Sequence, residues 1–562
     1  MLKKAIFSFV VASASATAFA QTTYLKLDTE DYNLLDKLET KSGELTNNFF
    51  TSIKPIPRNG AIEFLWEKRK NAREMNLSTI DRYNIDHAIS VSGEWAPDEN
   101  GAIDSRRPIF KTFYKKQPDF VHVKTKDFFL SVNPVISAQL MSEQNSNSTG
   151  GTKYWSTRGL ELRGWIGKKI GFYTYLADNQ EKVPGFVDDW ITKNRAVPGG
   201  DLYRKNGGTY DYFMARGYVD FALIKNRVNV TFGHDNHFIG DGVRTLYISN
   251  FSAPATFLRL NTKIWKLNYQ NIFMELTPQY ITNPEDNRLP RKYATIHTLS
   301  INATRWLNIG VYESVMFSRR DRFEFGYMIP LIFYRAIERG MGSPDNVNIG
   351  LNFKAVVAKR FQFYGQLLLD EFKTKELFSN SGWWANKWGI QLGGKYFDAL
   401  GIKNLDLQGE INMVRPYTYT HRDSTSNFTH YNQPFAHPLG AGFQEIIGIL
   451  RYQPVKNLFV TVRGMYYRQG IDTGMSNFGS NIFADYATRN QEYGVKMING
   501  VQATCASLNL NLSYELKENL FIDLGATHRE YEVANNLLPK HTTNYFYGGL
   551  RLNIARRDYD FY

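Results

Sequence analysis

The chain has 562 residues, a formal net charge of +13 and a mean hydropathy of −0.40. Its single cysteine, Cys505, excludes an internal disulfide framework. After the N-terminal residues, no segment approaches the roughly 20 continuous apolar residues that a transmembrane helix requires. Aromatic residues make up 15% of the chain, which argues against a series of ordinary soluble domains.

The N-terminus has the layout of a secretory signal peptide. Two lysines follow Met1-Leu2, a mostly apolar run extends from Ala5 to Ala16, and the small-x-small sequence Ala18-Phe19-Ala20 precedes Gln21. This order predicts a signal peptide over residues 1–20 and a mature protein that begins at Gln21. No cysteine lies at the cleavage point, so a lipoprotein is not expected. Export without disulfides is typical of a bacterial envelope protein.

Residues 21–125 are expected to form a periplasmic helical subdomain and a linker. Apolar residues recur at helical spacing from about Asp28 to Gly93, and Ser78 with Asp81 resembles a capping box that opens a helix ending near Ile89. A loop rich in proline and charge follows over residues 97–116. The competing interpretation is that these helices are a plug or packing element with no separate function.

From residue 126 to 562 the hydrophobic period becomes two. In one segment, Leu508, Leu510 and Leu512 alternate with Asn509 and Asn511. One apolar and one hydrophilic face suit a wall between lipid and a polar lumen, and the high aromatic content suits interfacial girdles. The pattern predicts an all-β transmembrane barrel of about eighteen antiparallel strands, at residues 126–142, 155–166, 169–177, 213–224, 227–233, 254–261, 264–276, 292–303, 306–317, 346–358, 361–371, 385–397, 403–413, 441–452, 457–467, 499–514, 519–530 and 542–554.

Connection lengths alternate along these strands. Each connection from an even-numbered strand to the next is short, whereas most reverse connections are long, namely 178–212, 234–253, 318–345, 414–440 and 468–498. Short periplasmic turns and long outer loops are the usual asymmetry of such barrels, so both chain ends are expected on the periplasmic side. The tail ending in Tyr559, Phe561 and Tyr562 fits a terminal insertion signal.

The stretch from Val228 to Leu260 contains an unusual loop between two strands. A metal site and a His/Asp hydrolytic pair are both conceivable there, but no third zinc-type ligand and no nucleophile is fixed by spacing. We expect instead a tight lumen loop without catalytic residues or metal, formed by His234, Asp235, His237, Gly240, Asp241, Gly242 and Arg244. Candidate lumen partners of Asp241 and Arg244 are Glu161, Arg163, Asp406, Glu410 and Arg463.

Three other outer loops are rich in side chains that suit sugars. Flat aromatic faces can stack on sugar rings, and amides and imidazoles supply directed hydrogen bonds. Candidate glycan-binding residues are Trp383, Trp384, Trp388, His430, Tyr431, Asn432, Gln433, His437, Asn477, Asn481 and Arg489. The competing interpretation is an aromatic girdle at the membrane interface together with packing between loops.

Several segments carry a family resemblance. They are RRPIFKTFYKKQPDFVHVKTKDFFLSVNP, GHDNHFIGDGVRTLYISNFSAP, FEFGYMIPLIFYRAIERGMGSPDN, GWWANKWGIQLGGKYFD and HYNQPFAHPLGAGFQE. In this order they resemble the Wzi-type capsule assembly proteins of Bacteroidetes, over most of the mature chain. The resemblance implies an eighteen-stranded outer-membrane barrel with a periplasmic helical element that attaches or organises capsular or other surface polysaccharide. Members in gliding bacteria are also linked to cell-surface motility.

These observations favour a non-enzymatic protein of the Gram-negative outer membrane that binds surface polysaccharide and needs no cofactor. The net positive charge suits an acidic glycan or lipopolysaccharide phosphates, although solvated loop lysines and the membrane interface also explain it. Expected partners are surface or capsular polysaccharide, outer-membrane lipid and lipopolysaccharide; motility or secretion proteins are further candidates, and nucleic acid is not expected. The alternatives are a component of the gliding machinery, a transport pore and an outer-membrane hydrolase.

Overall fold

The computed structural model describes residues 22–97, 104–105, 108–145, 148–224, 227–278, 289–319, 322–330, 334, 340, 342, 345–371, 373–377, 379–423 and 425–561. The expected signal peptide, its cleavage point at Gln21 and the terminal Tyr562 lie outside these residues.

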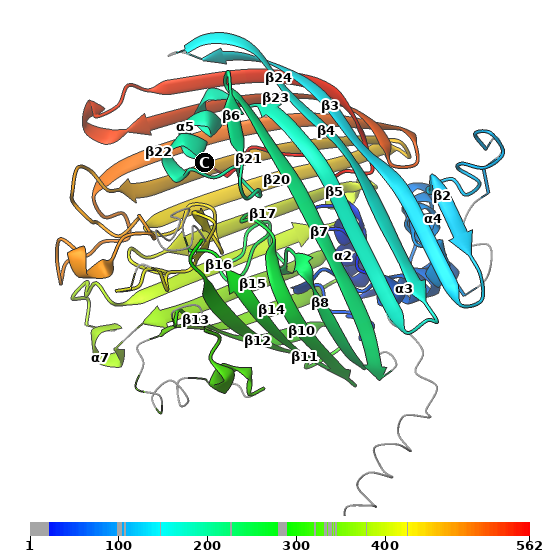
Figure 1. Ribbon diagram of the computed structural model, residues 1–562, viewed down its shortest axis with the longest axis horizontal. Helices are drawn as coiled ribbons and strands as arrows, with labels where there is room; N and C mark the ends of the chain where they lie inside the picture. The colour runs from blue at the N-terminus through cyan, green and yellow to red at the C-terminus, as the bar shows by residue number, and fades with distance from the viewer. Residues whose placement is uncertain are drawn as a thin grey trace, which may run out of the picture.

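Eighteen long strands in the described part of the chain form a closed antiparallel barrel (Figure 1). Pairing of β24 with β3 closes the wall, with Ala138 opposite Leu550. The strands are β3 (Phe128–Asn145), β4 (Ser148–Ile166), β5 (Ile170–Lys182), β7 (Thr209–Ile224), β8 (Val228–Asp235), β10 (Ala255–Ile264), β11 (Leu267–Leu276), β12 (Lys292–Asn302), β13 (Leu307–Phe317), β14 (Asn346–Val357), β15 (Phe361–Glu371), β16 (Lys387–Tyr396), β17 (Leu405–Val414), β20 (Phe443–Val455), β21 (Leu458–Ile471), β22 (Val501–Lys517), β23 (Leu520–Val533) and β24 (His541–Leu552).

The remaining elements are short. The other strands are β1 (Ile53–Lys54), β2 (Val121–Lys124), β6 (Arg204–Asn206), β9 (Phe238–Ile239), β18 (Thr429–His430) and β19 (Gln433–Pro434). The α-helices are α2 (Asp31–Ser42), α3 (Arg58–Lys70), α4 (Thr79–Val91), α5 (Gly185–Asn194) and α7 (Thr374–Leu377). The 3₁₀ helices are η2 (Gly93–Trp95), η4 (Phe325–Met328), η5 (Ala399–Gly401), η6 (Tyr486–Thr488) and η7 (Ala534–Asn536). Within the described ranges, none of the helices combines the length and the apolar character needed to cross a membrane.

The predicted barrel class and strand order are confirmed, and the main differences lie at the long-loop end. There β4 begins earlier than expected, at Ser148 instead of residue 155, and β5 continues to Lys182 instead of residue 177. The apolar and polar alternation identifies only the part of a strand that contacts lipid. Beyond that band the strands remain paired by backbone hydrogen bonds, but their side chains need not alternate in polarity. A strand located from the alternation is therefore shorter than the strand in the structure.

The two faces of the wall differ as the alternation predicts. On β22 the outward-facing Leu508 is 55% exposed, whereas Asn511 and Ser513 are at most 2% exposed and point into the lumen. Across the ladder on β23, Leu524 is outward and Asp523 is buried. The outer surface is therefore apolar and the interior is polar, as a transmembrane barrel requires.

The N-terminal helices lie at the end of the barrel where the strand connections are short, which we call the turn end (Figure 1). Their own core includes Leu38, Phe64 and Ile85. The predicted capping box at the start of α4 is present, since Ser78 and Asp81 exchange side-chain to backbone hydrogen bonds of 2.9 Å. These helices form one small packed unit.

Ion pairs attach this unit to the lumen wall. Asp36 of α2 lies 2.5 Å from Lys395 of β16, and Glu39 of α2 lies 2.5 Å from Lys354 of β14. All four side chains are buried, so loss of one partner would leave an unpaired buried charge at a cost of about 3–5 kcal/mol. The arrangement agrees with the packing or plug interpretation of the helical region.

The C-terminal tail, residues 553–561, also enters the lumen. It leaves β24 at the turn end and reaches α5 near the opposite end, which carries the long loops and which we call the loop end (Figure 1). Tyr559 donates a 3.0 Å hydrogen bond to Glu181, and Phe561 packs against Trp190. Tyr559 and Phe561 are therefore buried lumen residues and do not form the exposed end of a strand, as an insertion signal would.

One contact between α4 and the wall should respond to pH. His87 lies 3.0 Å from Glu515. Burial alone would lower the pKa of His87. The hydrogen bond to Glu515 and the nearby carboxylates have the larger effect and raise the pKa of His87 to about 9. Protonated His87 therefore stabilises the attachment of α4 below pH 6.5, and this contribution disappears as the pH rises through 9. A shift of this size corresponds to about 3 kcal/mol.

We expect the free energy of opening of α4, measured by hydrogen exchange and corrected for the intrinsic rate, to fall between pH 6.5 and pH 9.5. His87→Gln should have a lower value at pH 6.5 and lose most of the pH dependence. An unchanged slope in His87→Gln would show that another group controls the attachment.

Candidate functional site: the inward segment and the loop rim

The connection between β8 and β10, residues 236–254, folds into the lumen, and we call it the inward segment. Glu410 of β17 accepts the backbone N–H groups of Val243 and Arg244, at 2.7 and 2.9 Å. On another side, Asp241 accepts a 2.6 Å hydrogen bond from Thr51 of the N-terminal region. The segment therefore connects the barrel wall to the N-terminal region across the lumen.

Two glycines make this path possible. Gly240 has a φ of +152°, a backbone conformation that other residues rarely adopt. At Gly242 a Cβ atom would lie 2.4 Å from a carboxylate oxygen of Glu410 and 2.8 Å from the carbonyl oxygen of Arg244. The sequence pattern of glycines in this loop thus corresponds to a sharp change of direction and a close approach to the wall.

Arg244 is buried and lies among acidic groups that come from distant parts of the chain. Its guanidinium is 3.6 Å from Glu445 and donates a 2.5 Å hydrogen bond to the carbonyl oxygen of Asp560 in the tail. Burial lowers the pKa of Arg244, but the carboxylates of Asp560, Glu445 and Glu410 raise it by more. The inward segment and the C-terminal tail therefore hold each other.

The predicted lumen partners divide into two groups. Glu410 binds the inward segment directly, and Arg463 pairs with Asp560 beside Arg244. The other three candidates form ion pairs with the N-terminal region instead. Glu161 pairs with Lys26, Arg163 with Glu94, and Asp406 with Lys37. Their lumen position was predictable from the alternation, but their partners lie more than 65 residues away in the chain.

The histidines of this stretch have no catalytic arrangement. His234 belongs to β8 and lies 3.1 Å from Thr256 on the neighbouring strand, while Asp235 accepts a 2.8 Å bond from the N–H of Asn236. His237 is 2% exposed, its ring lies 4.4 Å from Phe257, and burial holds its pKa well below its usual range. Among the described residues, no three His, Cys, Asp or Glu side chains are grouped to hold a metal ion.

Two of the three predicted glycan loops meet at the loop end. The N–H groups of Gly494 and Val495 donate 2.9 Å bonds to the carbonyl oxygens of Ser381 and Gly382. Tyr417 lies between them and donates a 2.8 Å bond to the carbonyl oxygen of Asn477. We call residues 373–377, 379–386 and 472–499 together the loop rim. The backbone bonds fix its two parts relative to each other.

The three tryptophans of the first loop have different environments. Trp384 is 8% exposed and is covered by Arg489, whose guanidinium lies 4.3 Å from the ring centre. Trp383 is half-buried, with Lys373 4.4 Å from its ring centre. Trp388 lies on β16 at the same parity as the outward-facing Leu392 and thus belongs to the wall. Of the three tryptophans, only Trp383 therefore presents a partly accessible ring at the rim.

The polar candidates in the third loop also differ in accessibility. Asn477 is 5% exposed, and its side chain bonds to the backbone of Gly479 and Asp485. Arg489 forms an ion pair with Glu492 besides its contact with Trp384. Asn481 is exposed, so it is the member of this set that is free to contact a glycan.

The candidates of the second loop lie mostly inside the barrel mouth. His430 accepts the N–H of Thr277 and donates to the carbonyl oxygen of Pro254, and burial lowers its pKa to about 3. Gln433 is fully buried against the backbone of residues 199–200, and His437 pairs with Glu445 at 2.8 Å. These three side chains support the structure of the mouth.

Tyr431 and Asn432 form the turn between β18 and β19 and remain half-buried. They are therefore the second-loop candidates that a ligand could still reach.

The contribution of the C-terminal tail was not predicted. Arg557 lies 2.9 Å from Glu181, and Arg463 lies 3.2 Å from Asp558. The signal in the sequence is the alternation of charged and aromatic residues after the last strand, RRDYDFY, because neither lipid nor a short exposed tail requires such a mixture.

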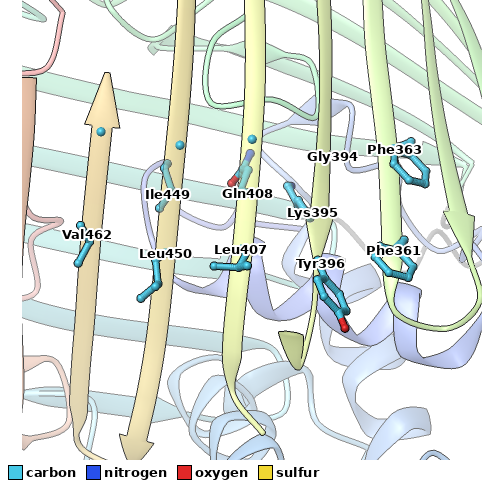
Figure 2. A pocket seen from close by; sticks show the side chains of 13 residues that line it. Phe361, Phe363, Gly394, Lys395, Tyr396, Leu407, Gln408, Ile449, Leu450 and Val462 are labelled. Carbon is cyan, nitrogen blue, oxygen red and sulfur yellow. The ribbon is translucent and has the colours of Figure 1, made fainter. Parts of the chain in front are cut away.

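The outer wall contains a depression of about 500 Å³ across β15, β16, β17, β20 and β21 (Figure 2). Four glycines are direct neighbours across the ladder there, namely Gly394, Gly409, Gly448 and Gly464. Its border is mainly apolar, with Phe361, Phe363 and Leu407 among the side chains shown. No convergent set of polar groups marks it as a glycan site; it is a shallow part of the lipid-facing surface.

We expect Gly242→Ala to loosen the inward segment, because the added methyl group would collide with Glu410. Overpacking of this kind costs about 1–3 kcal/mol. Hydrogen exchange of residues 240–247 should become faster in this variant. Gly409→Ala is the control, since a Cβ atom there meets no atom within 4 Å; equal protection in the two variants would contradict the assigned contact.

No protein-family model and no curated protein matches the chain. Among solved structures, Wzi of Escherichia coli, an outer membrane protein involved in group 1 capsule assembly and a carbohydrate-binding β-barrel, aligns with a TM-score of 0.52 at 11% identity, covering 94% of this chain and 99% of Wzi.

Two other solved structures are less similar. OprD from Pseudomonas aeruginosa gives a TM-score of 0.40 at 11% identity over 76% of this chain and 94% of its own. OccAB2 from Acinetobacter baumannii gives a TM-score of 0.40 at 9% identity, over 75% of this chain and 98% of its own. The alignment with Wzi supports a Wzi-like outer-membrane barrel fold for this chain.

Proposed function

We propose that this protein is a non-catalytic outer-membrane barrel that binds capsular or other surface polysaccharide at its loop rim. The observation that carries the proposal is the rim itself, which presents Trp383 and Asn481 on two loops joined by backbone hydrogen bonds. In this proposal residues 1–20 are a signal peptide, the turn end faces the periplasm and the rim faces outward. The carbohydrate binding of the structurally similar Wzi is consistent with it.

Rigidity of the rim favours binding of a flexible polymer. A preformed surface loses less conformational entropy on binding than loops that must first become ordered. Buried Trp384 and Asn477 are then supporting residues, since each fixes the backbone near an accessible neighbour. Repeated sugar units along one polymer would add avidity even when each contact is weak.

Charge beside Trp383 favours an acidic glycan. Lys373 lies beside the ring of Trp383 and both it and Lys375 are exposed. A sugar stacked on Trp383 would place its carboxylate near these ammonium groups. Exposed contacts of this kind mainly increase the rate of association and its dependence on salt.

The double variant Trp383→Ala/Asn481→Ala should bind polysaccharide from the host surface roughly tenfold more weakly, equivalent to about 1.4 kcal/mol. The measurement is calorimetric titration of the purified barrel in detergent. Trp265→Ala is the matched control, because Trp265 is 72% exposed in the turn between β10 and β11 at the other end of the barrel. Equal affinities of all three proteins would refute binding at the rim.

A transport pore would be a different function, and conductance separates it from the proposal. The inward segment, the N-terminal helices and the tail occupy the lumen, so we expect the intact protein to conduct poorly in planar bilayers. Glu410→Ala should raise conductance, because two backbone N–H groups of the inward segment lose their acceptor. A large open-channel conductance of the unaltered protein would favour the pore.

A further inference from the structure

The short strand connections at the turn end carry charge of one sign. Nine such connections join described strands, namely β2–β3, β4–β5, β7–β8, β10–β11, β12–β13, β14–β15, β16–β17, β20–β21 and β22–β23, and each contains or directly borders a Lys or Arg. Six exposed cations, one from each of six connections, are together called the basic ring: Lys169, Arg227, Arg360, Lys403, Lys456 and Lys517. Because the sheet is closed, these cations are distributed around the barrel and do not form a patch on one side.

Carboxylates do not neutralise the basic ring. Among the described residues, none of its six members has a carboxylate oxygen within 4.0 Å of a charged nitrogen. The nine connections contain the acidic residues Asp127, Asp398 and Glu518, and Asp398 is already bound to Lys41 of α2 at 2.6 Å. The connections at the turn end therefore carry an excess of exposed positive charge.

Several exposed cations at the loop end are arranged differently. Arg291 lies 3.2 Å from Glu275, and Lys540 lies 2.9 Å from Glu530. The opposite charges of such a pair largely cancel at a distance, so the pair attracts an external anion less than an unpaired cation does.

Apolar side chains accompany the basic ring. Within three residues of each cation along the chain lies an apolar side chain that is 42–53% exposed, and these neighbours are, in the same order, Ile166, Ile224, Val357, Ile402, Val455 and Leu516. Trp265 and Trp306, which are 72% and 48% exposed, lie in two further connections at this end. Apolar groups, tryptophan and cations side by side are typical of the boundary between the hydrocarbon of a membrane and its headgroups. The basic ring therefore lies at headgroup level.

The distribution of the ring favours a lipid surface over a soluble partner. Connections that follow each other around the barrel are two strand spacings apart, or about 10 Å. A soluble acidic molecule would contact the cations on one side only, whereas lipid headgroups approach the barrel from every side. Different members of the ring can thus pair with different headgroups at the same time.

We propose that the basic ring binds the headgroups of anionic glycerophospholipids in the membrane leaflet at the turn end. The phosphate oxygens accept hydrogen bonds from the ammonium and guanidinium groups, and the acyl chains cover the apolar neighbours. A zwitterionic headgroup also has a phosphate, but its own ammonium group weakens the attraction. This inference rests on the membrane-spanning barrel and uses no residue of the loop rim.

The test is electron spin resonance of the intact protein in vesicles of phosphatidylcholine. A trace of spin-labelled phosphatidylglycerol or spin-labelled phosphatidylcholine, with the same acyl chains, reports the fraction of lipid that the barrel immobilises. We expect phosphatidylglycerol to associate roughly threefold more strongly than phosphatidylcholine at low salt. This preference should fall as chloride is raised, because exposed charges are screened.

A matched pair of variants places the preference on the ring. Lys169→Gln/Arg360→Gln/Lys403→Gln/Lys517→Gln should lose most of the preference for phosphatidylglycerol. The control Lys193→Gln/Arg204→Gln/Arg422→Gln/Lys540→Gln removes the same amount of charge from exposed cations in the long connections of the other end, and should keep the preference. If the ring variant does not assemble, Lys169→Gln/Arg360→Gln and Lys403→Gln/Lys517→Gln, each compared with two of the control substitutions, decide the question.

Two results would overturn the proposal. Equal association of both labelled lipids with the unaltered protein would show that the ring does not distinguish headgroups, and would leave a soluble acidic molecule as its partner. An equal loss of preference in the ring and control variants would show that net charge acts without regard to position. Neither result bears on polysaccharide binding, since the rim variants and the ring variants change different residues.

Discussion

The structure depends on one constraint: a sheet that is apolar outside and closed into a barrel has an interior of polar groups that need partners. This chain supplies many of those partners itself. Glu410 binds the backbone of the inward segment, and Lys354 and Lys395 bind carboxylates of α2. Since an unpaired buried charge costs several kcal/mol, the wall and the segments inside it stabilise each other.

The wall could be predicted from the sequence because its rule is local. A residue of a spanning strand faces lipid or lumen according to parity alone, and eighteen strands were located in this way. The predicted strand ends were least accurate where β4 and β5 extend beyond the lipid, because side chains there need not alternate in polarity. The capping box of α4 was also predictable, because both of its members lie within three residues.

The interior could not be predicted to the same depth, because its contacts join distant parts of the chain. Arg244 and Asp560 are 316 residues apart, and no local pattern identifies such a pair. The candidate glycan residues show a related limit: Trp384 and Trp388 lie in one short stretch, but one supports loop packing and the other faces outward from a strand. Composition does not distinguish the members of one loop by their accessibility.

The path of the C-terminal tail has a consequence for how the molecule assembles. Residues 553–561 follow the strand that closes the barrel, yet their partners lie on the inner wall and on the inward segment. Arg557 of the tail pairs with Glu181 of β5, which lies across the seam between β24 and β3, so the full set of tail contacts exists only in the closed barrel. Residues 553–561 thus act as a latch on the barrel, and a segment that continues from Phe561 would start within an already crowded interior.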